Sequence, residues 1–485
     1  MKHIHFIGIG GIGMSGIAQI LLSKGYTVSG SDLKKSHITE RLTNLGARIF
    51  YSHSGKNIEN ADTVVISSAI SEKNPELAYA RAKKIKVIQR AQMLSFLMEG
   101  QMGIAVAGTH GKTTTTSMIA YVMRSCGLDP TAIIGGELGA ISSNASSGKG
   151  SYLVAEADES DASFLYLSPN HAVITNIDSD VNLNIEPYAS NKSDYNSLMK
   201  AVSRVFLEFT KRVAPEGRIV LCADSEYVRK VLPDIKNNYI TYGINHDADL
   251  RAENIKLHDF SSESHIYYKN EFLGELKLKV PGRHNVQNAL ACLAICMEIG
   301  LNFEEIVSAI SSFGGLKRRF EILGTKNGMT IVDDYAHNPS KLRAAMHATK
   351  TGNAERVIAI FQPHRYSRTR FLMHELSEAF FEADKLVVMD IYAAGEKIDP
   401  EINSKILAEL IKEKSPNVDV IYLPKSADVL DWLSKETISG DMIITLGAGD
   451  VCNVSKEFYN SILTDSSIKT KPSIITERLF ASPIE

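Results

Sequence analysis

Glycine, lysine and threonine, the residue types that bind nucleotide phosphates, stand together in one short segment. Residues 103–107 predict a buried strand and residues 114–124 a helix. Between them lie Gly108, Thr109, His110, Gly111, Lys112, Thr113 and Thr114. In such a loop the backbone amides hold the β-phosphate, the lysine pairs with β- and γ-oxygens, and the threonine ligates Mg²⁺. The full Walker pattern has glycine where Val106 stands, so this loop is a shortened form. A glycine-rich turn without this role is the alternative, and the flanking strand and helix favour the phosphate site.

An acidic run follows the next apolar strand in the same region. Residues 152–155 are apolar, and residues 156–161 contain four carboxylates. Such runs are usually solvated turns. In open α/β sheets, however, ligands bind at the carboxyl ends of the strands, and a carboxylate there can hold Mg²⁺. Glu156 is therefore our candidate metal ligand.

A second glycine-rich loop opens the chain. Gly8, Gly10, Gly11 and Gly13 lie between an apolar strand and a helix, and Asp32 ends the next predicted strand. This spacing matches the dinucleotide fingerprint, in which glycines let the backbone approach a diphosphate. The loop alone favours NAD or FAD, although the diphosphate of a UDP-sugar satisfies the same chemistry.

Polar clusters later in the chain also follow predicted strands or begin helices. They are 281–288, 317–321, 333–339 and 362–370. The first can be a helix start, the second a solvated linker, and the last a nucleic-acid patch. A net charge of -3 argues against nucleic acid as a partner, so we expect the arginines at 365–370 to bind a small carboxylate.

The elements that must position these groups alternate between strands and helices over nearly the whole chain. This alternation predicts α/β layers with parallel sheets. We place domain boundaries near residues 100 and 315, which gives domains of 1–100, 101–315 and 316–485. Short alternating segments between 245 and 279 predict antiparallel hairpins, and the residues from 465 onward predict a loosely held tail.

Composition limits the class of protein. A chain of 485 residues is too long for one core. Five scattered cysteines form no Cys-x-x-Cys pair, so neither a zinc site nor a disulfide framework is expected. No signal peptide and no membrane-spanning stretch is recognisable. We therefore expect a cytoplasmic protein without membrane insertion, as a monomer or homodimer.

These motifs together resemble the Mur ligase family, most closely its L-alanine-adding members, from Ile4 to about Asp450. The most specific segments are 8–16, 154–168, 281–291, 316–320, 361–370 and 390–396. The resemblance implies an α/β fold of three domains. These are a Rossmann-like N-terminal domain for a UDP-sugar, a central P-loop ATPase domain, and a C-terminal Rossmann-like domain that admits an amino acid.

The resemblance also implies a reaction: ATP phosphorylates the carboxylate of UDP-N-acetylmuramate, and L-alanine attacks the acyl phosphate. The cofactors would be ATP and Mg²⁺, and Thr113 and Glu156 would bind the metal. The residues implied for the nucleotide and the reacting carboxylate are Lys112, His284, Asn288, Arg319 and Asp334. The first loop becomes a UDP-sugar site with Gly8, Gly10, Gly11, Gly13, Asp32, Ser68 and Arg90. The L-alanine site would consist of Tyr335, His337, His364, Arg365 and Arg368. Because Arg319 and the L-alanine residues lie far from Lys112 in sequence, domain closure is expected to complete the site.

Two departures from the family pattern stand out. A histidine that binds metal in the family is replaced by Val181, and Asp180 or another nearby oxygen is a possible substitute. Asn338 stands where these members often have histidine. The alternatives to an active L-alanine ligase are a ligase that recycles whole peptides, a non-catalytic nucleotide-binding homologue and, last, a dehydrogenase.

Overall fold

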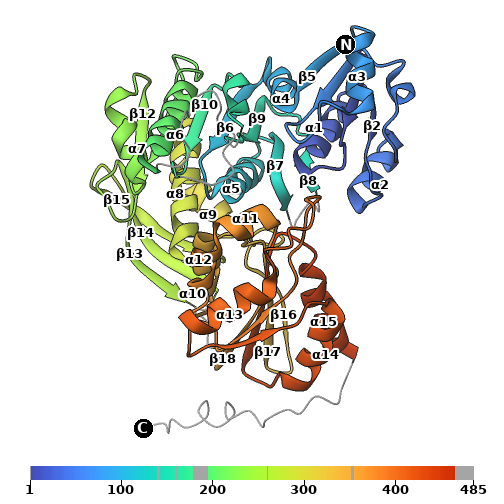
Figure 1. The fold of residues 1–485 in the computed structure, drawn as a ribbon. Helices are drawn as coiled ribbons and strands as arrows, with labels where there is room; N and C mark the ends of the chain where they lie inside the picture. Colours follow the sequence, from blue (N-terminus) through green and yellow to red (C-terminus); the bar gives the residue numbers. More distant parts are fainter. Residues whose placement is uncertain are drawn as a thin grey trace. The chain divides into compact units, whose positions relative to one another are not determined.

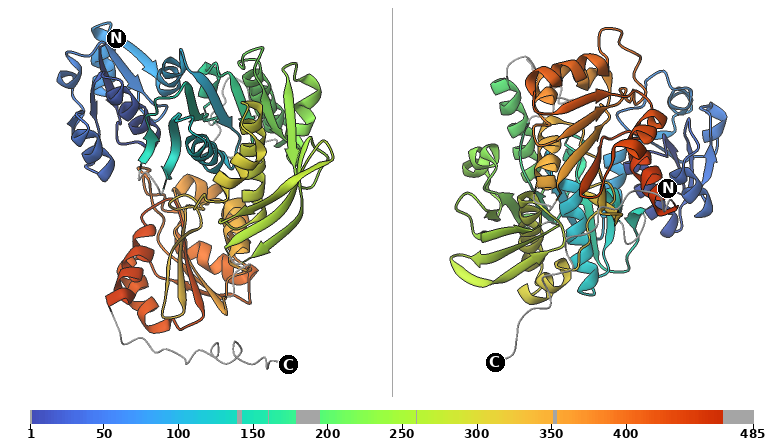
Figure 2. Two further views of the ribbon diagram at one scale, coloured as in Figure 1. Left: turned by 180° about the vertical axis from the view of Figure 1, so that it is seen from behind. Right: turned by 90° about the horizontal axis from the view of Figure 1, so that it is seen from below.

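The computed structural model describes residues 2–138, 143–159, 161–178, 195–258, 260–350 and 354–464. They form three sheets flanked by helices (Figures 1 and 2). By their internal contacts the residues divide into two compact units. The first comprises 1–257 and 261–316, and the second comprises 258–260 and 317–485. The predicted α/β class with parallel sheets is confirmed, whereas the two domain boundaries near residues 100 and 315 stay predictions.

The N-terminal sheet has five parallel strands in the order β3-β2-β1-β4-β5, an order typical of dinucleotide-binding folds. Along β1, Ile4 and Phe6 pack with helices α1 and α4, whereas Ile7 packs on the other face with α3. Because β1 is the central strand of this order, its end lies in the middle of the sheet edge. The elements are β1 (His3–Ile7), α1 (Ile12–Ser23), β2 (Thr27–Ser31), α2 (His37–Asn44), β3 (Arg48–Phe50), β4 (Thr63–Ile66), α3 (Pro75–Ala82), β5 (Lys86–Gln89) and α4 (Arg90–Met98).

The second sheet has ten strands in the order β15-β14-β13-β12-β11-β10-β6-β9-β7-β8. Its central strands are nearly all apolar because helices cover both faces. In β6, Ile104 and Val106 face a core that includes α5, α8 and α9, whereas Ala105 and Ala107 face the core that includes α6.

The elements of this sheet begin with β6 (Met102–Ala107), α5 (Lys112–Ser125), β7 (Thr131–Leu138), β8 (Ser143–Ser146), β9 (Tyr152–Glu156), β10 (His171–Ile174), α6 (Tyr195–Thr210), β11 (Ile219–Cys222) and α7 (Glu226–Val231). They continue with β12 (Tyr239–Gly243), β13 (Leu250–His258), β14 (Ser261–Tyr268), β15 (Glu271–Leu278), α8 (Arg283–Glu298) and α9 (Phe303–Ile310). The predicted antiparallel hairpin is confirmed, because β14 and β15 pair antiparallel.

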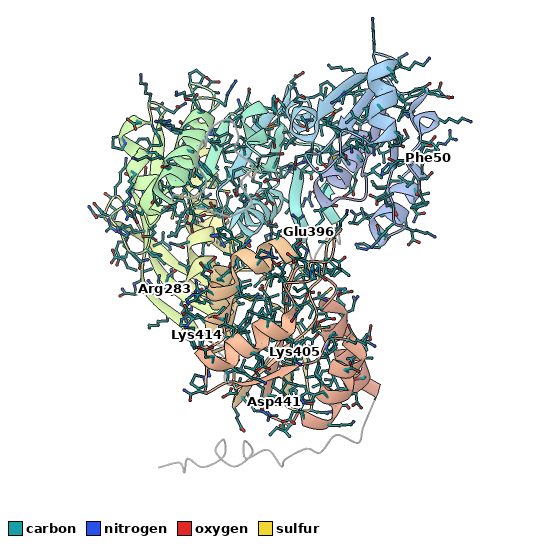
Figure 3. All side chains as sticks on the ribbon, in the orientation of Figure 1. Phe50, Arg283, Glu396, Lys405, Lys414 and Asp441 are labelled. Carbon is teal, nitrogen blue, oxygen red and sulfur yellow. The ribbon has the colours of Figure 1, made fainter. Side chains whose placement is uncertain are left out.

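The third sheet lies in the second unit and has the order β16-β17-β21-β18-β19-β20. All its neighbours are parallel except β16 with β17. Asp441, labelled in Figure 3, opens β21 and accepts two hydrogen bonds of 2.8 Å from the Arg356 guanidinium at the start of β18. This pair fixes the register of the two central strands.

The elements of the second unit are β16 (Glu321–Lys326), β17 (Met329–Asp334), α10 (Pro339–Lys350), β18 (Arg356–Phe361), α11 (Tyr366–Phe371), α12 (Met373–Ser377), β19 (Lys385–Val388), α13 (Ser404–Lys414), β20 (Asp419–Tyr422), α14 (Ser426–Glu436), β21 (Asp441–Leu446) and α15 (Cys452–Thr464). Across the described part of the chain, no helix has the length and apolar character needed to cross a membrane.

The first two sheets meet where β8 packs against α1. Asn144 is buried there. Its side-chain nitrogen donates to the Ser15 hydroxyl at 3.1 Å, and its oxygen accepts from Arg41 at 2.6 Å. Gly16 faces the same asparagine, so a larger residue in α1 would push the helix away from β8. These contacts hold the first glycine loop within the same unit as the second.

Candidate functional site

The phosphate loop runs from the end of β6 into α5, as the sequence predicts. Gly108 has φ +128° and Gly111 has φ +81°, a region that other residues rarely adopt. A Cβ atom at Gly108 would lie 2.1 Å from the Thr175 hydroxyl, and one at Gly111 would lie 2.6 Å from the Asn288 amide oxygen. Both glycines are therefore required by conformation and by space.

Lys112 points back over this loop. Its ammonium donates to the Gly108 carbonyl at 2.5 Å and pairs with the Glu159 carboxylate at 2.9 Å. Burial alone would lower the pKa of Lys112, but the nearby carboxylates of Glu159 and Glu156 raise it. Burial raises the pKa of Glu159 to about 7, against the attraction of Lys112. Lys112 is therefore charged at neutral pH, since it has both an anionic partner and a carbonyl acceptor.

Thr113 and Glu156 lie side by side at the start of α5 and the end of β9. The Thr113 hydroxyl donates to Glu156 Oε2 at 3.0 Å, and the Gly135 amide donates to the same oxygen at 2.8 Å. Two neighbouring ligands of an octahedral Mg²⁺ lie ~2.9 Å apart. The two oxygens therefore fit a shared Mg²⁺, with the remaining ligands from water and phosphate.

The other residues predicted for the nucleotide line the same loop. The His110 amide donates to the Asn176 side chain at 2.8 Å, and the Thr109 hydroxyl accepts from the Asp178 amide at 2.9 Å. Thr114 lies in the first turn of α5. These bonds fix the loop to the segment after β10.

Two further candidates come from α8, which lies much further along the chain. Asn288 is buried against the loop, where its amide oxygen accepts from Thr115 at 3.2 Å. His284 is exposed in the first turn of the same helix. Gly282 occupies the N-cap position of this helix, and no side-chain hydrogen bond caps it. Val181 and Asp180, the two residues named above for the altered metal site, lie outside the described residues.

The first glycine loop lies at the end of β1. The amides of Gly8 and Ile9 donate to the Ser31 carbonyl at 2.8 and 3.0 Å, and the Gly10 amide donates to Asp32 Oδ2 at 2.9 Å. Gly11 is the N-cap of α1. Within this loop no side chain carries a positive charge, so its donors are backbone amides at a helix N-terminus.

The remaining residues predicted for a UDP-sugar lie beside this loop. Ser68 is exposed in the turn after β4. Arg90 opens α4 and lies against Gly13, where an added Cβ would be 2.9 Å from its guanidinium nitrogen. The structure thus brings Arg90 to the first turn of α1.

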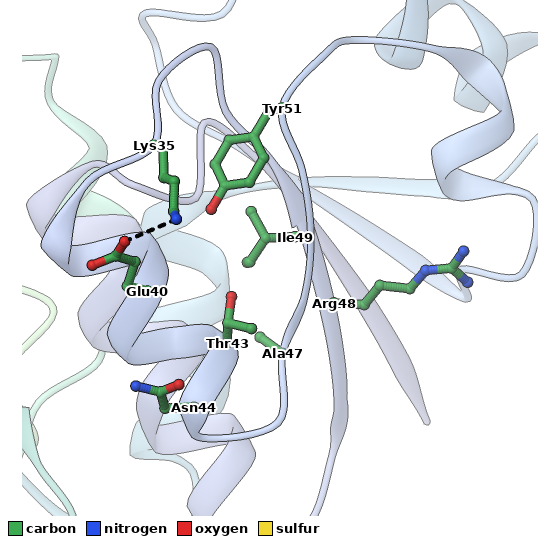
Figure 4. Close-up of a pocket in the computed structure, with 8 residues that line it drawn as sticks. All are labelled: Lys35, Glu40, Thr43, Asn44, Ala47, Arg48, Ile49 and Tyr51. Carbon is green, nitrogen blue, oxygen red and sulfur yellow. Dashed lines mark ion pairs between the residues drawn. The ribbon is translucent and has the colours of Figure 1, made fainter.

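A hollow of about 680 Å³ lies between α2 and β3 of the same sheet (Figure 4). Lys35 and Glu40 form an ion pair of 3.1 Å at its rim, and Tyr51 and Ile49 form another wall. None of the sequence-predicted site residues lines it.

In the second unit, the structure gathers the residues predicted for an amino acid. The ring centroids of Tyr335 and His337 are 5.3 Å apart, and those of His337 and His364 are 5.9 Å apart. Arg368 approaches His364 Nδ1 at 3.0 Å from α11. Arg365, the N-cap of α11, is exposed and has φ +71°. Rings and cations from the segments that follow β17 and β18 thus form one cluster.

Both imidazoles in this cluster are neutral at pH 7. Burial, followed by the charges of Lys341 and Arg368, lowers the pKa of His337 well below its ordinary value. Burial, followed by Arg368 and Arg365, lowers the pKa of His364 to about 4. The positive charge of the cluster therefore comes from its arginines.

Arg319 and Asp334 lie near this cluster, and each contacts other residues of the second unit. Arg319 lies over the Tyr335 ring, 5.4 Å from its centroid. Asp334 accepts the backbone amides of Phe320 and Ala336, each at 2.6 Å, and burial raises its pKa. Asp334 therefore ties the loop that carries Arg319 to the end of β17.

Two residues of these sites were missed by sequence reasoning. Glu159 lies in the acidic run, but the sequence did not show which carboxylate would reach Lys112. Tyr392 stacks on His364 with centroids 5.6 Å apart, and its carbonyl accepts from the Arg365 amide. It lies in segment 390–396, which the resemblance singled out without a role for this tyrosine, and which follows a strand as the other site loops do.

Comparison with known families agrees with this arrangement along most of the chain. Residues 3–102 match the model described as Mur ligase family, catalytic domain. Residues 106–296 match the Mur ligase middle domain, and residues 318–449 match the Mur ligase glutamate ligase domain. The chain belongs to the Mur ligase family.

Comparison with individual relatives indicates which kind of Mur ligase this chain resembles. A UDP-N-acetylmuramate–L-alanine ligase from Geotalea daltonii is 45% identical over 95% of this chain and 98% of its own length. The crystal structure of a UDP-N-acetylmuramate–alanine ligase from Thermotoga maritima matches with a TM-score of 0.81 at 28% identity. That match covers 96% of this chain and 100% of the other. A murein peptide ligase from Psychrobacter arcticus matches with a TM-score of 0.69 at 23% identity over the same shares, which shows the shared fold.

Proposed function

We propose that this protein joins L-alanine to the carboxylate of UDP-N-acetylmuramate at the expense of ATP, in the synthesis of peptidoglycan precursors. One observation carries the proposal. A chain 45% identical to a ligase with that name has a phosphate loop in which Lys112 pairs with Glu159 and Thr113 bonds Glu156. The peptide-recycling and non-catalytic alternatives are not favoured by the relatives.

The chemistry requires an activated carboxylate, because an amine does not displace oxide from a carboxylate at neutral pH. A carboxylate oxygen attacks the γ-phosphorus of ATP, ADP leaves, and an acyl phosphate forms. The neutral amine of L-alanine then attacks the acyl carbon, inorganic phosphate leaves, and the nitrogen loses a proton. Positioning and charge neutralisation are the protein's tasks in both steps.

In the first unit, Lys112 supplies a positive charge at the β- and γ-phosphates, and the loop amides hold the β-phosphate. Thr113 and Glu156 would hold Mg²⁺, which supplies further neutralisation of the phosphate oxygens. Asn288 supports the loop from α8, and His284 is exposed for the reacting carboxylate. The first glycine loop would hold the UDP diphosphate by its amides, with Asp32, Ser68 and Arg90 around it.

In the second unit, Arg365 and Arg368 would bind the carboxylate of L-alanine, since guanidinium groups pair with carboxylates in a bidentate manner. Arg370 carries the same charge, but it is already paired with Asp399 and Glu401. Neutral His337 and His364 do not repel the substrate ammonium, and Tyr335 completes the wall. Arg319 and Asp334 remain proposed for the ATP γ-phosphate and nucleotide.

The test is phosphate release by the full chain with ATP, Mg²⁺ and UDP-N-acetylmuramate. L-Alanine, glycine, L-serine and a tripeptide are the four acceptors to compare. We expect turnover with L-alanine to exceed that with the tripeptide, and we expect EDTA to abolish it. Turnover with none of the four would refute the proposal. Preference for the tripeptide would identify a peptide ligase, and nucleotide binding without turnover would identify a binding protein.

The wider properties of the protein are also proposals. All five cysteines are free, which suits a reducing cytoplasm where ATP is available. We propose a monomer or homodimer, which light scattering would distinguish. Boundaries near residues 100 and 315 can be tested by limited proteolysis, since linkers between domains are cleaved first.

A further inference from the structure

Arg90 lies at a junction between the two glycine loops. Its side chain covers the first turn of α1, since a Cβ at Gly13 would lie 2.9 Å from Nη1 and 3.2 Å from Cδ. From there its other terminal nitrogen donates to Asp158 Oδ2 at 3.0 Å. One guanidinium therefore contacts the first glycine loop and the acidic segment of the nucleotide site.

Asp158 has a distinct place in the acidic segment after β9. Glu156 accepts from Thr113, and Glu159 pairs with Lys112, so both face the phosphate loop. Asp158 stands between them and reaches Arg90 instead. A shift of Asp158 would therefore also shift Glu156 and Glu159, the two carboxylates that hold Thr113 and Lys112.

This ion pair contributes little as a bond. Its side chains are 21% and 40% exposed, and pairs of this kind stabilise a fold by about 0–1 kcal/mol. Its geometry matters more, because a planar guanidinium with five N–H groups can bind two anions at once. Asp158 takes one edge, and a diphosphate at the N-terminus of α1 would lie on the side of Gly13.

We propose that the Arg90–Asp158 pair couples the two substrate loops, so that a UDP-sugar at the first loop tightens nucleotide binding at the second. The inference rests on the proposed function, which places a diphosphate at the first loop. A bound diphosphate orders Arg90, and Arg90 then orders Asp158 and the segment that carries Glu156 and Glu159. Each ligand bears part of the ordering cost of the other, and the coupling is reciprocal.

Calorimetric titration of the full chain measures this coupling. The affinity for a non-hydrolysable ATP analogue with Mg²⁺ is compared with and without saturating UDP-N-acetylmuramate. We expect the sugar nucleotide to tighten the analogue about fivefold in the unchanged protein. In Asp158→Asn the ratio should fall to near one. Asp161→Asn removes the same charge from the same acidic run without touching Arg90, and it should keep the original ratio.

A double-mutant cycle separates positioning from folding. If Asp158 acts through Arg90, adding Asp158→Asn to Arg90→Lys changes the coupling ratio no further. A ratio of one in the unchanged protein, an unchanged ratio in Asp158→Asn, or an additional effect in the Arg90→Lys background would overturn the inference. Should Asp158→Asn misfold, a coupling ratio kept intact by Arg90→Lys alone would overturn it too. Failure of the unchanged protein to bind either ligand would instead count against the proposed function.

Discussion

The two glycine loops of the first unit share a strand–loop–helix plan but are held in different ways. The first loop is fixed by backbone hydrogen bonds to Ser31 and by the Asp32 carboxylate, and it contains no cation. The second is fixed by Lys112, which pairs with Glu159, and by Thr113, which bonds Glu156. A diphosphate that only anchors a substrate needs amides. A phosphoryl group that is transferred also needs charge that neutralises the transition state.

The support behind each loop differs as well. Behind the first loop, the Ser31 hydroxyl donates to Glu76 at 2.5 Å, and this carboxylate is fully buried with His53 at 3.1 Å. Burial would raise the pKa of Glu76, but the facing His5 ring, Ser31 and Asn57 lower it to about 2. The first loop is thus supported through Ser31 by a buried anion, whereas the second loop contains its own cation, Lys112, which pairs with a carboxylate that follows β9.

Loss of the loop cation should have the largest effect. Lys112→Met removes the charge that faces the phosphates, so turnover should fall by about 10³-fold or more. Binding of UDP-N-acetylmuramate in calorimetry should stay within about twofold, because the first loop does not depend on this lysine. Lys211→Met, at an exposed lysine of the same unit, is the matched control and should leave turnover unchanged. An equal loss in both variants would contradict the comparison.

Acid should affect the support of the first loop next most strongly. The Glu76 carboxyl has a pKa of about 2 when folded against an ordinary value of 4.5, so the unfolded chain takes up the proton first. Its contribution is complete above about pH 4.5 and is lost as pH falls through about 2, by about 3 kcal/mol in total.

Urea unfolding followed by circular dichroism between pH 7 and pH 3 measures this contribution. Glu76→Gln should be less stable at pH 7 and should show a shallower loss of stability in acid. Parallel pH profiles for the variant and the unchanged protein would show that the buried carboxylate does not provide this support.

Crowding in the first loop should have a smaller and more local effect. In Gly10→Ala the Cβ would lie 2.7 Å from Asp32 Oδ2 and 3.2 Å from the Thr39 methyl group, so the loop must shift. We expect KM for UDP-N-acetylmuramate to rise about tenfold with kcat nearly unchanged, since this loop binds without reacting. Gly314→Ala, at a glycine with open space around it, is the control. A fall in kcat at constant KM would indicate that the first loop takes part in the chemistry.

Removal of the lysine's partner should have the smallest effect. In Glu159→Gln the Lys112 ammonium keeps its hydrogen bond to the Gly108 carbonyl but loses its anionic partner. The lysine is then less firmly placed for the reaction. The Glu159 carboxylate also no longer competes with phosphate for the ammonium. We expect kcat to fall about fivefold while ATP binds about threefold more tightly. Asp161→Asn controls for the charge change alone. Weaker ATP binding in Glu159→Gln would mean that Glu159 positions Lys112 for binding rather than for turnover.

The local motifs of the chain were predictable because each depends on neighbours in sequence. Gly108–Thr113 lies at the turn from β6 into α5, and the first glycines lie at the turn from β1 into α1, as the apolar runs and glycine spacing predict. The antiparallel β14–β15 pair also followed from short alternating segments. Apolar periodicity and glycine conformation are properties of a few consecutive residues, so sequence reveals them directly.

Partners across long separations were not predictable in this way. The sequence showed four carboxylates at 156–161, but only the tertiary structure assigns Glu156 to Thr113, Glu159 to Lys112 and Asp158 to Arg90. Likewise, the sequence does not distinguish the roles of the three arginines at 365–370. Only the fold shows that Arg370 pairs with Asp399. Side-chain direction at the end of a strand depends on which elements pack beside it. The sequence by itself therefore determined which chemistry the loops contain, and the packing of distant elements decided which groups meet.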